Sequence, residues 1–195
     1  VCTMSQNNNI ALLPDMNRRK LLKAGLLVSL VCLNPLPAFA SYGLHGPGER
    51  SLSLLNTHTG ERLKEVVYWE QGSYIDNALD DLNYVLRDHR TDEVHPIDPI
   101  TLDQMAAISR KVDASRPFEI ISGYRSPQSN RALRNNSNGV AKNSYHMQGK
   151  AVDLRLPGVP LKVLRKAALD LRRGGVGYYP KSDFLHIDSG KVRSW

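Results

Sequence analysis

The sequence predicts a single α+β domain with a mainly antiparallel sheet and flanking helices. A hairpin pattern (51–69) comes first, two amphipathic helical patterns follow (73–90 and 95–112), and short strands then mix with helices to the end of the chain. Connections between the last strands are short, which favours antiparallel neighbours because parallel strands need a long crossover. The chain has 195 residues and is 41% hydrophobic, enough for one compact domain with its own core.

The first forty residues differ from the rest in composition. A basic segment, NRRKLLKAG (17–25), precedes a short apolar run, LLVSLVCLNPLPAFA (26–40), that ends in small residues. This order predicts a cleaved secretory signal peptide. The adjacent Arg18 and Arg19 resemble the twin arginines of a Tat signal, a route that exports folded proteins. The sequence therefore predicts a periplasmic protein exported by the Tat route.

An uncleaved N-terminal membrane anchor is the alternative interpretation. The apolar run is shorter than the ~20 residues that span a bilayer, and Asn34 and Pro35 interrupt it. We therefore expect 1–40 to be removed as a signal peptide and 41–50 to form a flexible Gly/Pro-rich leader. The functional domain is expected at 51–195, with no integral membrane segment left after cleavage.

Cysteine content and charge narrow the class of protein further. Cys2 and Cys32 both fall in the expected signal, so the exported domain would be held together by its core or by a metal rather than by disulfides. The chain has 26 basic and 19 acidic residues. Four of the basic residues and one of the acidic residues lie in 1–40, which leaves 22 basic and 18 acidic residues, a net charge of +4, in the remainder. Attraction to a polyanionic cell wall is one explanation of this charge, and a mixed solvated surface is the simpler one. No basic run is interleaved with aromatic residues, which argues against a nucleic-acid partner.

The first half of the domain predicts a hairpin and two helices. Two runs of alternating apolar residues flank NTHTGE (56–61), which predicts a β-hairpin with His58 in its turn. In 73–90 the apolar residues that recur on one helical face are Ile75, Leu79, Leu82, Val85 and Leu86. In 95–112, Asp98 suits the N-cap of a helix and Pro99 its first position. The expected buried stripe of this second helix consists of Ile100, Met105, Ile108 and Val112.

The second half predicts strands that alternate with helices. An apolar run (118–121) predicts a strand, and Ser126 followed by Pro127 predicts the start of the next helix. KAVDLRL (150–156) predicts an inner strand, and PLKVLRKAALDLRRGG (160–175) predicts a helix with basic residues in its last turn and glycines after it. The last two strands are expected at VGYYP (176–180) and FLHIDSG (184–190).

Two of the six histidines are placed to bind a metal. The others fall in the leader, the hairpin turn or the interhelical connection, where surface positions are expected, and they are His45, His58, His89 and His95. His146 and His186 lie beside apolar strand sequence, and His186 shares a strand face with Asp188. Asp153 lies in the middle of an expected inner strand, where an acid is costly to bury unless it is paired or bound to a metal.

Two imidazoles and one carboxylate are typical of a catalytic zinc site, because they leave one tetrahedral position open for water. The metal lowers the pKa of that water to about 7 and polarises a carbonyl group, and a nearby carboxylate moves the proton. Asp183 and Asp188, on either side of His186, are the candidate bases.

Ordinary structural roles are the alternatives. His186 would then be a core histidine bonded to a backbone carbonyl, and Asp153 would form an ion pair with Arg125 or Arg155. The spacing of His146 and Asp153 does not separate these alternatives by itself. The second histidine in FLHID favours the metal site.

Three segments resemble a known family of enzymes. SYHMQGKAVDLRL (144–156) fits the S-x-H-x-x-G-x-A-x-D pattern of the zinc D-Ala-D-Ala metallopeptidases, which include the VanX-type dipeptidases and share their fold with the Hedgehog signalling domain. ISGYRSPQSN (121–130) and GGVGYYPKSDFLHIDSG (174–190) are similar to two further segments of that group. Together with the Tat-like signal and the segment GKVRSW (190–195), they resemble most closely the YcbK/MepK-like periplasmic murein endopeptidases.

The resemblance implies a Hedgehog/DD-peptidase-like fold and one zinc ion per chain, bound by His146, Asp153 and His186. It implies that Arg125 holds the substrate carbonyl or stabilises the oxyanion, which suits a guanidinium beside a developing negative charge. Ser144 would position the substrate peptide or the first histidine ligand.

One departure from the family pattern concerns the general base. VanX-type members carry a glutamate three residues before the last histidine, where this chain has Asp183. Aspartate is one methylene shorter, so its reach to the attacking water is open. Asp188 is the alternative, either as the base or as an anchor for the imidazole of His186. Of the two, we favour Asp183.

The resemblance therefore predicts a zinc-dependent murein endopeptidase that hydrolyses peptide cross-links between peptidoglycan stems. A D,D-carboxypeptidase that trims terminal D-Ala and a non-catalytic wall-peptide-binding module of the same fold are the alternatives. Carboxylates on both sides of His186 favour an enzyme over the binding module. A structural zinc domain would need four protein ligands, and 41–195 holds no cysteine and no further well-placed histidine.

Overall fold

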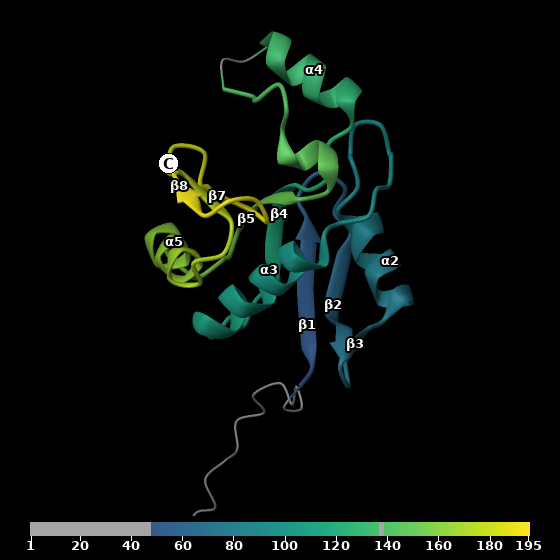
Figure 1. Ribbon diagram of the computed structural model, residues 1–195, viewed down its shortest axis with the longest axis vertical. Coiled ribbons are helices and arrows are strands. Elements are labelled where there is room, and N and C mark those ends of the chain that lie inside the picture. The colour runs from purple at the N-terminus through teal and green to yellow at the C-terminus, as the bar shows by residue number, and fades with distance from the viewer. Residues whose placement is uncertain (1–47, 137–138) are drawn as a thin grey trace, which may run out of the picture. The chain divides into compact units, whose positions relative to one another are not determined.

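The computed structural model describes residues 48–136 and 139–195 (Figure 1). The predicted signal peptide (1–40) and most of the predicted leader (41–50) lie outside these residues. The strands are β1 (Arg50–Asn56), β2 (Arg62–Glu70), β3 (Ser73–Tyr74), β4 (Phe118–Ser122), β5 (Ala151–Arg155), β6 (Gly175–Tyr179), β7 (Phe184–Asp188) and β8 (Arg193–Ser194). The helices are α2 (Asp76–Val85), α3 (Pro99–Lys111), α4 (Pro127–Asn136), α5 (Leu161–Asp170) and the short 3-10 helix η1 (Tyr145–Gln148).

The strands of the described chain form one sheet in the order β3-β2-β1-β4-β5-β7-β6-β8. Five of the seven pairings are antiparallel, whereas β1 with β4 and β6 with β8 run parallel. The predicted hairpin is β1 and β2, with His58 exposed in the turn between them. The prediction of an α+β domain with a mainly antiparallel sheet is therefore confirmed.

One face of the sheet carries the hydrophobic core. Alternation along β5 and β7 sends Leu154 and Leu185 to this face, which α2, α3 and α5 cover. Figure 1 shows α4 apart from these three helices, at the top of the view. Complete burial of each large aliphatic side chain contributes roughly 1.5–3 kcal/mol. The same alternation sends Asp153 and His186 to the opposite face, so the core holds in place the strands that carry them.

Helix α2 is shorter at both ends than the predicted range 73–90. Ser73 and Tyr74 pair with the end of β2 and form β3. Ile75 has an extended backbone (φ −104°, ψ 106°) and precedes the first helical residue. The helix ends at Val85. At the start of the predicted range, hydrogen bonds to β2 replace the helical ones. At its end, the chain leaves the helix because the next loop makes tertiary contacts.

That next loop turns toward the segment after β4. The carbonyl of Leu86 accepts a hydrogen bond from Tyr124 N (2.7 Å), and the carboxylate of Asp88 accepts one from Ser126 N (2.8 Å). Both pairs are far apart in sequence, so helical periodicity gives no sign of them. They bring the loop against the residues that precede α4, whose predicted cap is confirmed because Ser126 Oγ accepts from Ser129 N (3.2 Å).

The start of α3 is as predicted, since Asp98 caps it by accepting a hydrogen bond from Ile100 N (3.0 Å) and a proline follows. Its buried face differs from the predicted stripe, because Leu102, which was not predicted, is buried in place of Ile100, and Val112 is only partly buried. Leu102, Met105 and Ile108 are buried, whereas Ile100 is 52% exposed, so the prediction that Ile100 is buried is wrong. With about 3.6 residues per turn, a residue two positions away from Leu102 lies on nearly the opposite side of the helix.

The C-terminal part differs from the prediction in two places. Helix α5 ends at Asp170, and Arg172 has a left-handed backbone (φ 50°), so the basic residues lie beyond the helix rather than in its last turn. Strand β8 was not predicted, and it pairs in parallel with β6 at the edge of the sheet. A strand of two residues has no periodicity from which to predict it.

Candidate metal centre

His146 is presented by η1, a single turn between α4 and β5. Ser144 caps this turn, because its Oγ accepts a hydrogen bond from His146 N (3.3 Å). Gly149 ends the turn with a left-handed backbone (φ 65°), and a Cβ there would overlap with the carbonyl oxygen of Pro96. The glycine of S-x-H-x-x-G is therefore required by the geometry of the turn.

The backbone orients the ring of His146. Its Nδ1 lies 2.7 Å from the carbonyl oxygen of Gly123. A carbonyl oxygen can only accept, so Nδ1 carries the proton and Nε2 is left as an acceptor. Gly123 in turn lies so close to Leu86 that a Cβ at position 123 would overlap with the Leu86 carbonyl.

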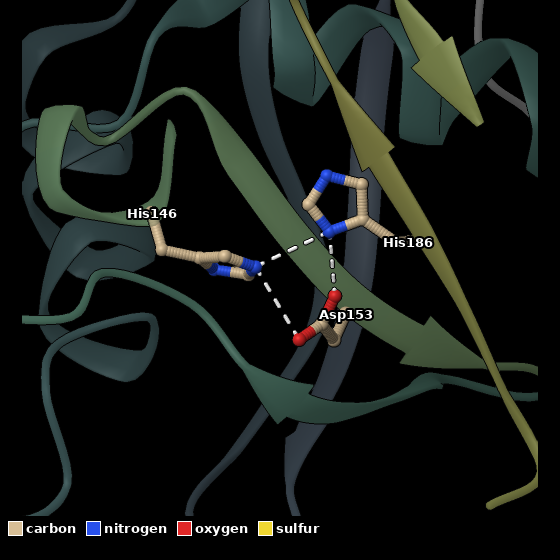
Figure 2. Close-up of side chains that lie close together, drawn as sticks. All are labelled: His146, Asp153 and His186. Carbon is tan, nitrogen blue, oxygen red and sulfur yellow. Dashed lines mark hydrogen bonds and ion pairs between the residues drawn. The ribbon is translucent and has the colours of Figure 1, made fainter. Parts of the chain in front are cut away.

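Asp153 and His186 are direct partners across the β5–β7 pairing. His186 Nδ1 lies 2.8 Å from one carboxylate oxygen of Asp153, and His146 Nε2 lies 3.3 Å from the other. The two ring nitrogens are 3.3 Å apart. Figure 2 shows the three side chains pointing toward one another. Within the described residues, this is the one group of three or more His, Cys, Asp or Glu side chains placed to share an ion, with its ligand atoms all within 4.8 Å of one another.

These contacts bring three hydrogen-bond acceptors face to face. The other ring nitrogen of His186, Nε2, lies 3.1 Å from Asp188 Oδ2 and so carries the proton of the neutral ring. Nδ1 of His186, Nε2 of His146 and the carboxylate of Asp153 then all present lone pairs to the same point. A proton or a cation must lie between them, and two nitrogens with one oxygen fit a transition-metal ion.

The pKa values of the cluster show the same need for positive charge. Burial acts to lower the pKa of His186, but hydrogen bonds to Asp153 and Asp188 outweigh it and raise the pKa to about 9. Burial acts to raise the pKa of Asp153, but the charge and hydrogen bonds of the two histidines hold it well below its usual range. A metal ion bound by these atoms would replace the proton on His186.

Asp188 contacts His186 from the non-ligand side and is 0% exposed. Its Oδ1 accepts hydrogen bonds from Gly175 N (3.1 Å), Gly190 N (2.8 Å) and Arg193 Nη1 (3.0 Å), and its Oδ2 accepts one from Arg193 Nη2 (2.7 Å). Burial acts to raise the pKa of Asp188, but the hydrogen bonds of His186 and Arg193 lower it strongly. These are the contacts of a carboxylate that orients an imidazole.

Arg125 lies beside the cluster and is only 8% exposed. Its Nη2 is 3.3 Å from Ser122 Oγ and 3.7 Å from Asp153, its Nη1 is 3.5 Å from Asn130 Oδ1, and its Nε has no partner among the described residues. Burial lowers the pKa of Arg125, and the charge of Asp153 acts against that effect. A desolvated guanidinium with unused donors can receive a carbonyl or anionic oxygen.

The predicted ion-pair alternative for Asp153 is therefore present only as the long contact to Arg125. Arg155 bonds Glu119 instead, at 2.6 Å. Asp183 lies in the turn between β6 and β7 with a left-handed backbone (φ 50°), and its carboxylate is 3.5 Å from Arg155 Nη1. Arg155 and Asp153 share a strand face, so the Asp183 carboxylate lies on the side of the sheet that carries the cluster.

The remaining histidines are away from this cluster. His58 is exposed, as predicted, and its ring stacks on His89 with centroids 3.8 Å apart. His89 and His95 are half-buried, so they reach the surface only in part. Burial, together with the charges of Arg90 and His58, lowers the pKa of His89 to about 4. The partners that bury these rings are distant in sequence, and His45 lies outside the described residues.

Sequence reasoning also missed residues that support the cluster without binding at its centre. They are Gly123, Tyr145, Arg193 and Trp195. Gly123 lies within the quoted segment SGYRS, where its need for close backbone approach could have been suspected. Nothing in the pattern around Arg193 or Trp195 indicated that the first contacts Asp188 and the second lies against His186.

Two imidazoles and a carboxylate that meet between a mixed sheet and the turn η1, beside a buried arginine, define the class of protein: a candidate single-metal hydrolase. A profile of the peptidase M15 family described as "Peptidoglycan L,D-endopeptidase MepK" matches residues 45–195. The chain belongs to this family.

Curated relatives match over nearly their whole length. The Escherichia coli K12 protein named "Peptidoglycan L,D-endopeptidase MepK" is 45% identical over 181 residues, which are 93% of this chain and 98% of that protein. A Shigella flexneri protein of the same name has the same identity and coverage. The Haemophilus influenzae protein named "Probable peptidoglycan L,D-endopeptidase MepK" is 41% identical over 182 residues, which are 93% of this chain and 96% of that protein.

Proposed function

We propose that this protein is a zinc-dependent endopeptidase that hydrolyses peptide cross-links of peptidoglycan, at the L,D bonds given in the names of its relatives. The observation that carries the proposal is the convergence of His146, Asp153 and His186 beside the buried guanidinium of Arg125. Family membership supplies the substrate class.

Zinc is the proposed ion because two imidazole nitrogens and one carboxylate oxygen are ligands that it prefers. When bound with one position open, zinc supplies the Lewis acidity that activates a water molecule and polarises the scissile carbonyl. The protein contributes the fixed ligand geometry: Gly123 orients His146, and Asp188 orients His186.

Arg125 is proposed to bind the oxygen of the scissile carbonyl and the negative charge that develops on it. Its burial supports this role, since a charge acts more strongly where water is excluded. The contacts of its Nη atoms with Asn130 and Ser122 are long (3.5 and 3.3 Å), which leaves these donors for the substrate. Removing one such donor in other enzymes costs about 10²–10³ in kcat.

Asp183 is proposed as the general base that takes a proton from the attacking water and delivers it to the leaving amine. Its exposed carboxylate is held by a single long contact to Arg155, whereas both oxygens of Asp188 are already occupied. This contrast supports Asp183 as the catalytic carboxylate and Asp188 as the anchor of His186. The contact of Ser144 with His146 N supports a role in positioning the first histidine ligand.

The cell envelope is the proposed place of action, because the relatives are named for peptidoglycan cleavage. A periplasmic location reached through the signal at 1–40 is part of the proposal, and the Tat route rests on the Arg18–Arg19 pair. In the described residues, no helix is long and apolar enough to cross a membrane.

Digestion of purified sacculi tests the proposed function. The protein loaded with zinc is expected to convert cross-linked muropeptide dimers into monomers, and added chelator is expected to stop the conversion. Loss of terminal D-Ala with dimers intact would instead identify a D,D-carboxypeptidase. Binding to sacculi without any change in muropeptides would identify a wall-peptide-binding module, and both outcomes contradict the proposed endopeptidase.

A further inference from the structure

Strand β8 and the tryptophan after it lie behind the metal centre. The strand is fixed to β6 by hydrogen bonds of Arg193 N to Gly174 O (3.3 Å) and of Trp195 N to Val176 O (3.2 Å). No residue of this strand has a role in the proposed reaction. Its side chains nevertheless reach both segments that carry the histidine ligands.

The first connection runs through Asp188 to His186. Two nitrogens of the Arg193 guanidinium donate hydrogen bonds to the carboxylate of Asp188, at 2.7 and 3.0 Å. The same carboxylate lies 3.1 Å from Nε2 of His186, whose Nδ1 faces Asp153. Paired contacts from a planar guanidinium fix a carboxylate in rotation as well as in position. The backbone N–H groups of Gly175 and Gly190 also hold Oδ1 of Asp188, whereas Arg193 donates to Oδ2, the oxygen that contacts the His186 ring.

The second connection runs to the segment of His146. The guanidinium carbon of Arg193 is 5.3 Å from the ring centroid of Tyr145 and 4.8 Å from that of Trp195. Tyr145 precedes His146 in η1, and its ring packs so closely on Gly190 that a Cβ there would lie 2.8 Å from it. The ring of Trp195 in turn lies against His186, with centroids 5.4 Å apart.

We propose that Arg193 is a positioning residue of the metal centre: it fixes His186 through Asp188 and ties that ligand, through the Tyr145 ring, to the segment that carries His146. The inference rests on the proposed metal centre and extends it to a residue that touches neither ligand. Its consequence is that the metal affinity depends on an arginine at the edge of the sheet.

The chain offers a matched control in Arg50. Arg50 also pairs with an aspartate, Asp103 (2.6 Å), and its guanidinium lies 4.2 Å from the ring of Trp69. It belongs to β1, outside the metal centre. A variant at Arg50 loses the same kinds of contact as a variant at Arg193, so it separates a general loss of packing from a loss at the metal site.

The test is a zinc titration of the full protein in competition with a chelating dye. Supporting partners of metal ligands typically change metal affinity by about 10–100-fold. Arg193→Gln is expected to weaken zinc binding by about tenfold, Arg193→Lys to restore part of that loss, and Arg50→Gln to leave the affinity unchanged. The melting temperatures of the metal-free variants show that each is folded. Wild-type affinity in a folded Arg193→Gln protein would overturn the proposal.

A double variant tests whether Arg193 acts through Asp188. Asp188→Asn alone is expected to weaken zinc binding, and adding Arg193→Gln is expected to weaken it no further, because the two residues form one path. If the losses of zinc affinity in the two single variants multiply fully in the double variant, Arg193 does not act through Asp188. Wild-type protein that binds no zinc would overturn the proposed metal centre itself, a result distinct from normal zinc binding in the Arg193 variant.

Discussion

Asp153 and His186 face each other across β5 and β7, and a carboxylate oxygen and a ring nitrogen meet there at 2.8 Å. The pairing register brings the two side chains within reach, because partners on one face of an antiparallel pair have Cβ atoms about 4.5–5.5 Å apart. His146 joins them from a separate turn, so the site needs both the sheet and η1.

Removal of a histidine ligand is expected to abolish zinc binding. His186→Ala leaves two ligands and a buried carboxylate without its partner, so the purified variant should contain no zinc, whereas wild type should contain about one per chain. Elemental analysis measures this content. His58→Ala, in the exposed hairpin turn, is the control and should retain the metal. Zinc retained in folded His186→Ala would contradict the assigned ligand set.

Substitution of Arg125 is expected to reduce turnover without loss of zinc. Arg125→Lys keeps the charge but replaces the planar set of donors with a single ammonium, so kcat for a cross-linked muropeptide should fall by about 10²-fold. Arg131→Lys, on the exposed side of α4, should leave kcat unchanged. Equal kcat values for the two variants would contradict the proposed role of Arg125 in binding the substrate carbonyl.

The general base is tested by Asp183→Asn. Asparagine keeps the size and tolerates the left-handed backbone at this position (φ 50°) but cannot take a proton. Activity on sacculi should fall by about 10²–10⁴-fold while zinc binding stays normal. Asp113→Asn is the matched control, because Asp113 is also exposed with a φ of 50°. Full activity of Asp183→Asn would show that another group moves the proton.

The close approach at Gly123 is expected to matter for stability and for the metal. A Cβ at Gly123 would overlap with the Leu86 carbonyl, and Gly123 O orients His146. Gly123→Ala should lower the free energy of unfolding by about 1–3 kcal/mol and also weaken zinc binding. Gly139→Ala meets no atom within 4 Å and should change neither. Urea unfolding and dye competition measure the two effects, and an unchanged Gly123→Ala protein would refute the argument.

The lowered pKa of His89 is expected to make the free energy of unfolding depend on pH. Its pKa is about 4 in the folded protein, against 6.5 as the ordinary value. Between these values the unfolded chain binds a proton that the folded chain rejects, so stability should fall as pH drops from 6.5 to about 4, with no further loss from this residue below that. Unfolding of the metal-free protein at pH 7 and pH 4.5 should show a smaller difference for His89→Gln than for wild type. An identical difference would mean that His89 is not held neutral.

Local patterns in the sequence indicated much of the fold. The hairpin, the cap of α3 by Asp98, the inner strand with Asp153 and the strand with His186 all follow from alternation, helical periodicity and capping chemistry. These signals are local, since they depend on residues within one turn or one strand. Ile100 shows the limit of these local signals. It was predicted to be buried, but which face of α3 is buried depends on how the whole helix is rotated against the sheet.

The sequence by itself indicated His146, Asp153 and His186 as candidate metal ligands, because an acid in an inner strand and histidines beside apolar strands are local features, and the family resemblance implied the same set. Only the tertiary structure brought their atoms within 4.8 Å of one another and placed Arg125 beside them. It also gave the two aspartates near His186 different surroundings, with Asp188 enclosed by Gly175, Gly190 and Arg193 and Asp183 left exposed. The physical reason is that sheet register and backbone contacts between distant segments set these distances, and neither has a signature in local periodicity.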